Sequence, residues 1–168
     1  MVSDDSESAA RTGFFQNSED VFALLCSLSH SLETIGAMAE VGSYADGERS
    51  LLVRALGALS VGDLLVLDRG YPAWWLFALF GQRGVPFCAR LDSCSCGSAK
   101  VRQFVRSGAA EQVIEVHLKS PDLAKLRKAA GQAQAPTVLR LRLVRVVLST
   151  GNIEVLVTSL LDTVAYPA

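Results

Sequence analysis

Short apolar runs alternate along this chain with polar or glycine-containing segments, and each run predicts a buried element. The run Val21–Cys26 is wholly apolar, which is typical of a buried strand. A second strand is predicted over Glu33–Val41, with a turn around Ser29–Ser31 between the two. For both segments the periodicity leaves a helix open as the alternative.

The clearest helical pattern begins after Asp46 and ends before Gly62. Its apolar positions share one face at 3.6 residues per turn; they are Leu51, Leu52, Ala55, Leu56 and Leu59. The compact run Leu64–Leu67 then predicts a strand buried on both faces, as in a parallel sheet. Pro72 suits the first turn of a helix that continues to Phe80, before Gly81 and Gly84 stop it.

Val85–Leu91 is the next predicted strand, so Leu64–Leu91 forms a βαβ unit. After a loop at Ser93–Ser98, the rear half is predicted to be mostly β with meander connections. Its expected strands are Val113–Leu118, Val138–Leu148 and Ile153–Thr158, with a hairpin turn at Ser149–Asn152. Pro121–Ala130 is left open between a short helix and a loop.

Composition narrows the class of protein. The 168 residues suit one domain, and half of them are hydrophobic, which excludes a disordered or fibrous chain. The longest apolar stretches without charge, between Asp20 and Glu33 and between Arg69 and Arg83, fall short of a membrane span. Residues 1–18 are expected to be a disordered leader and not a signal peptide. The four cysteines are therefore expected to be free thiols in a reducing cytosol: Cys26, Cys88, Cys94 and Cys96.

Charge is unevenly distributed. Residues 1–99 hold six basic and twelve acidic side chains, whereas residues 100–168 hold ten basic and five acidic ones. A basic rear half is compatible with a nucleic-acid partner and also with an ordinary soluble domain.

Asp68 is the first candidate for chemistry. It follows a buried strand and precedes a helix, where α/β sheets place ligands; the alternative is a carboxylate that accepts backbone N–H groups of its own turn. Arg69 and Arg90 lie near the same site and are candidates for phosphate contacts, the alternative being ion pairs with Asp63 or Asp92.

Other candidates are weaker. Arg140 and Arg142 alternate with leucines, so both should lie on one face of a strand, either against a DNA backbone or in solvent. Tyr71, Trp74 and Trp75 are expected to pack at the start of the helix, although Trp74 has the shape to stack on an unpaired base. Cys94 and Cys96 lack the second ligand pair of a zinc site. The sequence has no glycine-rich phosphate loop, and neither His30 nor His117 has a triad-like companion.

Several segments in order resemble the DDE transposases of the insertion-sequence-four type, over roughly residues 11–168. The segments are Gly47-Glu48-Arg49, Gly62–Leu65, Asp68-Arg69-Gly70-Tyr71, Phe87–Leu91 and Gly151–Leu160. The resemblance implies an α/β fold: an incomplete RNase H-like core, with a mixed sheet and flanking helices, at residues 19–92, and a β-rich insertion at residues 93–168.

The resemblance also implies a function. Asp68 matches the second of three acids that hold two Mg²⁺ or Mn²⁺ ions for cleavage and transfer of DNA strands. DNA, both transposon ends and target, would be the partner, with a homodimer also open, no membrane association, and a bacterial cytoplasmic, nucleoid-associated location.

The first and third acids of that pattern have no match here. Asp4 and Asp5 lack an apolar strand around them, and the chain stops at Tyr166-Pro167-Ala168, before a helix that could carry the glutamate. We therefore expect an internal or truncated piece of a transposase. Whether it is an enzyme is left open, the alternative being a catalytically silent remnant that binds DNA or a protein. The missing first strand would lie between the Val21–Cys26 and Leu64–Asp68 strands and leave two unpaired edges.

Overall fold

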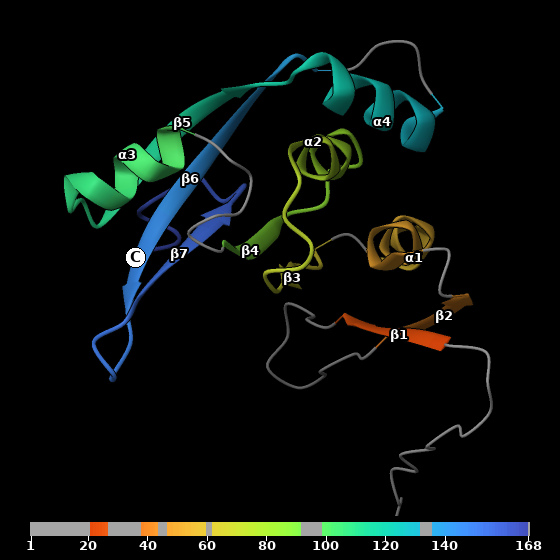
Figure 1. Cartoon of the computed structure of the whole chain (residues 1–168), viewed down its shortest axis with the longest axis horizontal. Helices are drawn as coiled ribbons and strands as arrows, with labels where there is room; N and C mark the ends of the chain where they lie inside the picture. Colours follow the sequence, from red (N-terminus) through yellow and green to blue (C-terminus); the bar gives the residue numbers. More distant parts are fainter. Residues whose placement is uncertain are drawn as a thin grey trace, which may run out of the picture.

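The protein has a mixed α/β fold, shown in Figure 1. The structure is a computed structural model that describes residues 21–26, 38–43, 47–59, 62–91, 99–131 and 136–167. The predicted leader, Asp4, Asp5, His30, and the loop with Cys94 and Cys96 lie outside these ranges.

A five-stranded sheet forms the centre of the fold. Its strands are, in spatial order, β3 (Leu65–Leu67), β4 (Phe87–Leu91), β7 (Ile153–Thr158), β6 (Val138–Val147) and β5 (Glu111–His117). β3 and β4 are parallel, while the other neighbours are antiparallel. Strands from both sides of residue 92 therefore share one sheet.

Helix α2 (Trp74–Gln82) connects β3 to β4 and confirms the predicted βαβ unit. It is apolar on nearly every side, and Leu76–Phe80 are all buried. The ring of Phe77 stacks on that of Phe87 in β4, with centroids 4.5 Å apart. The helix starts just after Pro72 and Ala73, and Gly81 lies inside it instead of stopping it; the chain turns at Gly84, which has a φ of 66°.

β3 is buried on one face only, so the expectation of burial on both faces is wrong. Leu65 and Leu67 point into the core, but Val66 between them is 43% exposed. Successive side chains of a strand point to opposite sides. The second face of the sheet is thus open at β3, and Asp68 follows on this same side.

The three strands predicted in the rear half are present as antiparallel neighbours, β5, β6 and β7, and two helices accompany them, of which the first was not predicted. Helix α3 (Ala99–Ser107) buries Val101 and Phe104. Helix α4 (Ser120–Ala130) settles the choice left open for this segment, and it lies beside α2 (Figure 1). The hairpin between β6 and β7 is confirmed, with a turn bond from the Leu148 N–H to the Asn152 carbonyl.

A second, two-stranded sheet is formed by β1 (Val21–Cys26) and β2 (Met38–Ser43), which pair antiparallel. The second predicted strand thus starts and ends later than Glu33–Val41. Helix α1 (Gly47–Ala55), continued by a short 3-10 helix at Leu56–Ala58, packs on this pair as the apolar face predicts (Figure 1). β1 comes close to β3 but belongs to a different sheet.

Within the described ranges, every helix is too short or too polar to cross a lipid bilayer.

Candidate functional site

Asp68 stands at the carboxyl end of β3 with its side chain 72% exposed. Leu67 is the register partner of Ala89 in the parallel strand β4, so the next residues, Asp68 and Arg90, lie side by side. The Arg90 Nε atom is 3.2 Å from Asp68 Oδ1. The sheet register itself therefore creates this ion pair.

Glu154 on β7 completes the group, because β7 runs antiparallel beside β4. Its carboxylate accepts a hydrogen bond from Arg69 Nη2 at 2.8 Å and lies 3.6 Å from Arg90 Nε. We call Asp68, Arg69, Arg90 and Glu154 the Asp68 cluster. The ion-pair alternative for both arginines is thus correct in kind, but the partners are Asp68 and Glu154 and not Asp63; Asp92 lies outside the described residues.

Sequence reasoning missed Glu154. The signal was present, since Glu154 is the one charged residue of the strand Ile153–Thr158. What the sequence does not reveal is that this strand pairs with β4. That pairing connects residues more than sixty positions apart, and no local periodicity encodes it.

Arg90 keeps hydrogen-bonding capacity in this cluster. Its Nε atom is buried and, despite the nearby carboxylates, makes no hydrogen bond within the described part of the chain. Its contact with Asp68 is therefore electrostatic attraction without hydrogen-bond alignment. The Arg90 side chain as a whole is 38% exposed, so part of it is accessible to solvent although Nε is not.

The alternative role predicted for Asp68 is that its carboxylate accepts backbone N–H groups of its own turn. The structure does not show such bonds for this carboxylate among the described residues. The Tyr71 N–H donates to the main-chain carbonyl of Asp68, at 3.1 Å, and not to the side chain. The carboxylate is left facing Arg90 and solvent. Tyr71 and the two tryptophans pack partly buried against the core, as expected for the start of the helix.

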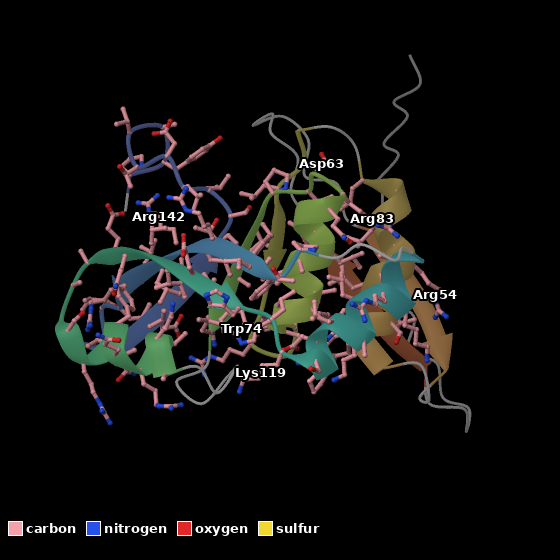
Figure 2. The ribbon with its side chains drawn as sticks, turned by 90° about the horizontal axis from the view of Figure 1, so that it is seen from above. Arg54, Asp63, Trp74, Arg83, Lys119 and Arg142 are labelled. Atoms are coloured by element: carbon pink, nitrogen blue, oxygen red, sulfur yellow. The ribbon has the colours of Figure 1, made fainter. Side chains whose placement is uncertain are left out.

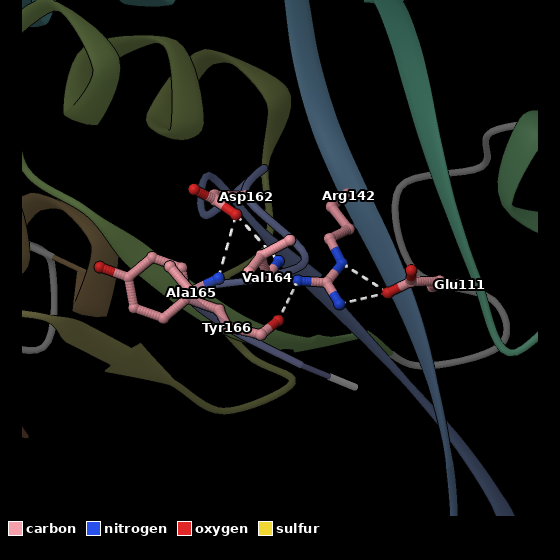
Figure 3. A network of polar contacts seen from close by, with 6 residues as sticks. All are labelled: Glu111, Arg142, Asp162, Val164, Ala165 and Tyr166. Carbon is pink, nitrogen blue, oxygen red and sulfur yellow. Dashed lines mark hydrogen bonds and ion pairs between the residues drawn. The ribbon is translucent and has the colours of Figure 1, made fainter.

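Arg140 and Arg142 occupy the same face of β6, as their alternation predicts, but only Arg140 is exposed. The Arg140 side chain is 65% exposed, with Glu115 on β5 3.9 Å away. Arg142 is buried: it donates to the Glu111 carboxylate and, through Nη1, to the Tyr166 carbonyl (Figure 3). The expectation that both lie against solvent or DNA fails for Arg142, because the chain after β7 folds back over it.

Cys88 lies on β4, two positions before Arg90 and on the same face of the strand. It is a free thiol. Burial raises its pKa, because the thiolate would lose solvation there. The thiol therefore stays protonated at neutral pH and contributes no charge to the site.

The described residues form no cluster of acids that would hold a metal ion by itself. Among the residues that the structure describes, no three His, Cys, Asp or Glu side chains come together closely enough to hold an ion. Asp68 and Glu154 are two oxygen donors on either side of Arg90.

Comparison with known proteins gives no relative: no family model, no curated protein and no solved structure matches this chain.

Proposed function

We propose that this chain is part of the catalytic domain of a DDE-type transposase, in which Asp68 is a metal ligand and DNA lies along the neighbouring arginines. The observation that carries the proposal is the exposed carboxylate of Asp68 at the carboxyl end of β3, in a parallel βαβ unit. Open α/β sheets bind ligands at this edge.

The arrangement of the strands supports the RNase H-like part of the proposal. An antiparallel pair, β1 and β2, precedes a parallel pair, β3 and β4, and β1 and β3 approach each other as edges of separate sheets. A strand inserted between β1 and β3 would join both sheets. This is the position that the resemblance assigns to the strand with the first acid.

Asp68 fits a divalent metal in part. A solvent-exposed carboxylate is a hard oxygen ligand, and Mg²⁺ is often held by one or two carboxylates together with water and substrate phosphate. When bound there, such an ion would polarise a phosphodiester and activate the attacking oxygen. The role of Asp68 is to hold it, and Arg90 competes for the same carboxylate.

The arginines of the cluster fit a phosphate backbone. Arg69 and Arg90 flank Asp68 with partly exposed side chains. The Nε atom of Arg90 is itself buried, so a phosphate would meet the exposed part of that side chain. Arg140 is exposed on the same face of the sheet. Arg142 is excluded from this surface, since its donors are used internally.

The second candidate is the catalytically silent, DNA-binding remnant. The observation that favours it is the ion pair of Asp68 with Arg90, which places a fixed positive charge where a metal would compete. The two candidates share the DNA-binding surface and differ only in metal binding and cleavage.

Metal binding separates the candidates. Mn²⁺ binding to the full chain is measured from the paramagnetic resonance signal of the free ion, for the wild type, Asp68→Asn and Asp63→Asn. Asp63 is the matched control because it precedes the same strand, at the opposite end from Asp68. We expect Asp68→Asn to weaken binding by at least about tenfold, because even outer-shell partners of a metal contribute that much. Equal affinities in all three proteins would refute the metal-ligand role.

Duplex binding and plasmid nicking complete the test. Retardation of duplex DNA should weaken with salt, and Arg69→Gln or Arg140→Gln should each reduce the salt slope by about one. Arg83→Gln, an exposed arginine just after α2, should leave the slope unchanged. Metal-dependent nicking that Asp68→Asn abolishes would exclude the silent remnant. Absence of duplex binding at low salt would overturn both candidates.

A further inference from the structure

A pocket of about 610 Å³ opens where α2, α3, α4 and the end of β5 meet. None of the residues of the Asp68 cluster lines it. Its volume lies within the range of small-molecule sites, roughly 300–1,000 Å³. Its lining includes Trp74, Trp75, Lys119, Lys125, Glu115 and Asp122.

The charge of the pocket wall is strongly positive. Arg49, Lys100, Arg102, Lys119 and Lys125 line it, against two acids, Glu115 and Asp122. Four of these cations belong to the basic rear half of the chain. Such a wall attracts anions.

Two of the cations are available to a ligand. Arg49 already donates to the carbonyls of Gly70, Tyr71 and Pro72. Its donors are therefore used within the protein, where they hold the pocket wall in place. Lys100 donates to the Glu115 carbonyl. Lys119 and Lys125 form no ion pair or side-chain hydrogen bond with any residue that the structure describes.

Both tryptophans of the chain line the same pocket. Each is half-buried against the core. Trp74 meets Phe77 edge-on, at 5.9 Å between ring centroids, and Lys119 lines the same pocket (both are labelled in Figure 2). Flat apolar surfaces next to lysines suit a ligand with a planar ring and an anionic group.

Helix geometry adds to the positive field. α2 and α4 both begin at the pocket, after Ala73 and Lys119, and neither start has a side-chain cap. At α4, Pro121 lacks an N–H and Asp122 adds a negative charge, so the positive field comes mainly from α2. The first N–H groups of a helix have no partner within the helix and favour anions.

We propose that this pocket binds one nucleotide, with its base against an indole of Trp74 or Trp75 and its phosphate between Lys119 and Lys125. The nucleotide is either free or an unpaired unit of a nucleic-acid strand, since both present the same base and phosphate. The inference does not depend on metal binding at Asp68, and it rests on different residues.

Tryptophan fluorescence tests the proposal directly, because both indoles of the chain lie in the pocket. The full chain is titrated with adenosine monophosphate, adenosine and inorganic phosphate. We expect the monophosphate to quench the indole emission and to bind at least about tenfold more tightly than either part, the free-energy equivalent of one charge-assisted hydrogen bond. No quenching by millimolar monophosphate, or equal binding of inorganic phosphate, would overturn the proposal.

A matched pair of variants locates the phosphate. Lys119→Gln combined with Lys125→Gln should weaken monophosphate binding by about tenfold or more. Arg127→Gln combined with Lys128→Gln removes the same charge from exposed positions of α4 outside the pocket and should change it little. Equal losses of monophosphate affinity in both double variants would show that only overall charge matters. That result would refute the placement of the phosphate at Lys119 and Lys125.

Titration with a single-stranded oligodeoxyadenylate distinguishes a free nucleotide from an unpaired unit of a strand. Binding more than about tenfold tighter than the monophosphate assigns the pocket to an unpaired strand, and weaker binding assigns it to a free nucleotide. Arg83→Gln, at an exposed arginine outside both the pocket and the Asp68 cluster, is the control in this arm and should leave the quenching unchanged. Loss of duplex binding with intact quenching by the monophosphate would overturn the DNA surface at the Asp68 cluster and leave the pocket standing.

Discussion

Arg142 is an arginine whose role is structural, and it is 2% exposed. It joins three parts of the chain: its own strand β6, Glu111 at the start of β5, and the Tyr166 carbonyl after β7 (Figure 3). A buried charge needs such partners, because an unpaired one costs several kcal/mol. The contacts therefore hold the end of the chain on the open face of the sheet.

Replacing Arg142 by methionine should destabilise the protein by roughly 2–3 kcal/mol, because Glu111 and the Tyr166 carbonyl lose their donor. This loss lies below the roughly 3–5 kcal/mol of fully buried pairs, because the Glu111 side chain is 35% exposed and keeps part of its hydration. Urea unfolding measures the change. The control is Arg140→Gln, an exposed position two residues away, which should stay within about 0.5 kcal/mol of the wild type. Similar losses in both variants would contradict the structural role.

Asp162 lies in the turn after β7 and has a lowered pKa. Backbone N–H groups of Ala165 and then Val164 donate to its carboxylate, with Arg142 as a smaller electrostatic contribution. These bonds favour the charged form in the folded state. They therefore stabilise the fold above the ordinary aspartate pKa, about 4, and this contribution is lost as the pH falls through the lowered folded value.

The variant Asp162→Asn does not titrate, so its stability relative to the wild type should depend on pH. The wild type should be more stable at neutral pH, and the difference should shrink below about pH 4. Urea unfolding at a series of pH values measures it. A difference that stays constant into the acid range would show that the carboxylate charge is not involved.

The turn of the β6–β7 hairpin depends on one glycine, Gly151. Gly151 has a φ of 80°, and its N–H donates to the Leu148 carbonyl at 2.8 Å. A side chain there would meet no atom within 4 Å, so the backbone conformation alone sets the cost. For residues with a Cβ, the left-handed backbone region costs about 1–2 kcal/mol.

Gly151→Ala should therefore lower the free energy of unfolding by about 1 kcal/mol. The neighbouring Thr150→Ala, an exposed turn position, should change it by less than about 0.5 kcal/mol. Thermal or urea unfolding of the two variants gives the comparison. An unchanged Gly151→Ala protein would mean that the turn adopts another geometry.

At the end of helix α3, an arginine from a distant strand adds to the local cap, in which the Ser107 hydroxyl donates to the Phe104 carbonyl. Arg145 on β6 donates to the carbonyls of Phe104, Val105 and Ala109. Its guanidinium also lies 5.7 Å from the centroid of the Phe104 ring. The last carbonyls of a helix have no partner within it, so a side chain from a distant strand completes the element.

For the whole molecule, the two sheets leave strand edges that are not paired with each other. β3 ends the five-stranded sheet, and β1 pairs with β2 alone among the strands described. Unpaired edges promote association with other chains. The exposed Val66 lies on the edge strand β3.

Val66→Lys should therefore reduce concentration-dependent self-association, because an edge lysine disfavours strand addition. Val147→Lys is the control: Val147 is also exposed, but it lies beside the β6–β7 hairpin turn, paired with Ile153, and not on the edge strand β3. Sedimentation of both variants over a range of concentrations measures the effect. A monomeric wild type, or an equal reduction by the two variants, would refute the role of this edge.

The sequence by itself determined the elements whose signals are local. The apolar face of α1, the βαβ unit around Asp68 and the β6–β7 hairpin depend on periodicity and turn residues, and they were predicted with small errors at the ends. Asp68 was placed correctly at the end of β3 for the same reason. α3 was missed although Val101, Phe104 and Val105 follow helical spacing, because its apolar residues are few.

Only the tertiary structure decided which segments meet. Glu154 joins Asp68 because β7 pairs with β4, and Arg142 is buried because the chain after β7 crosses it. The lysine and tryptophan pocket unites segments from α2, α3, α4 and β5. Contacts of this kind arise from the packing of distant surfaces, and the pattern along a single chain does not specify their partners.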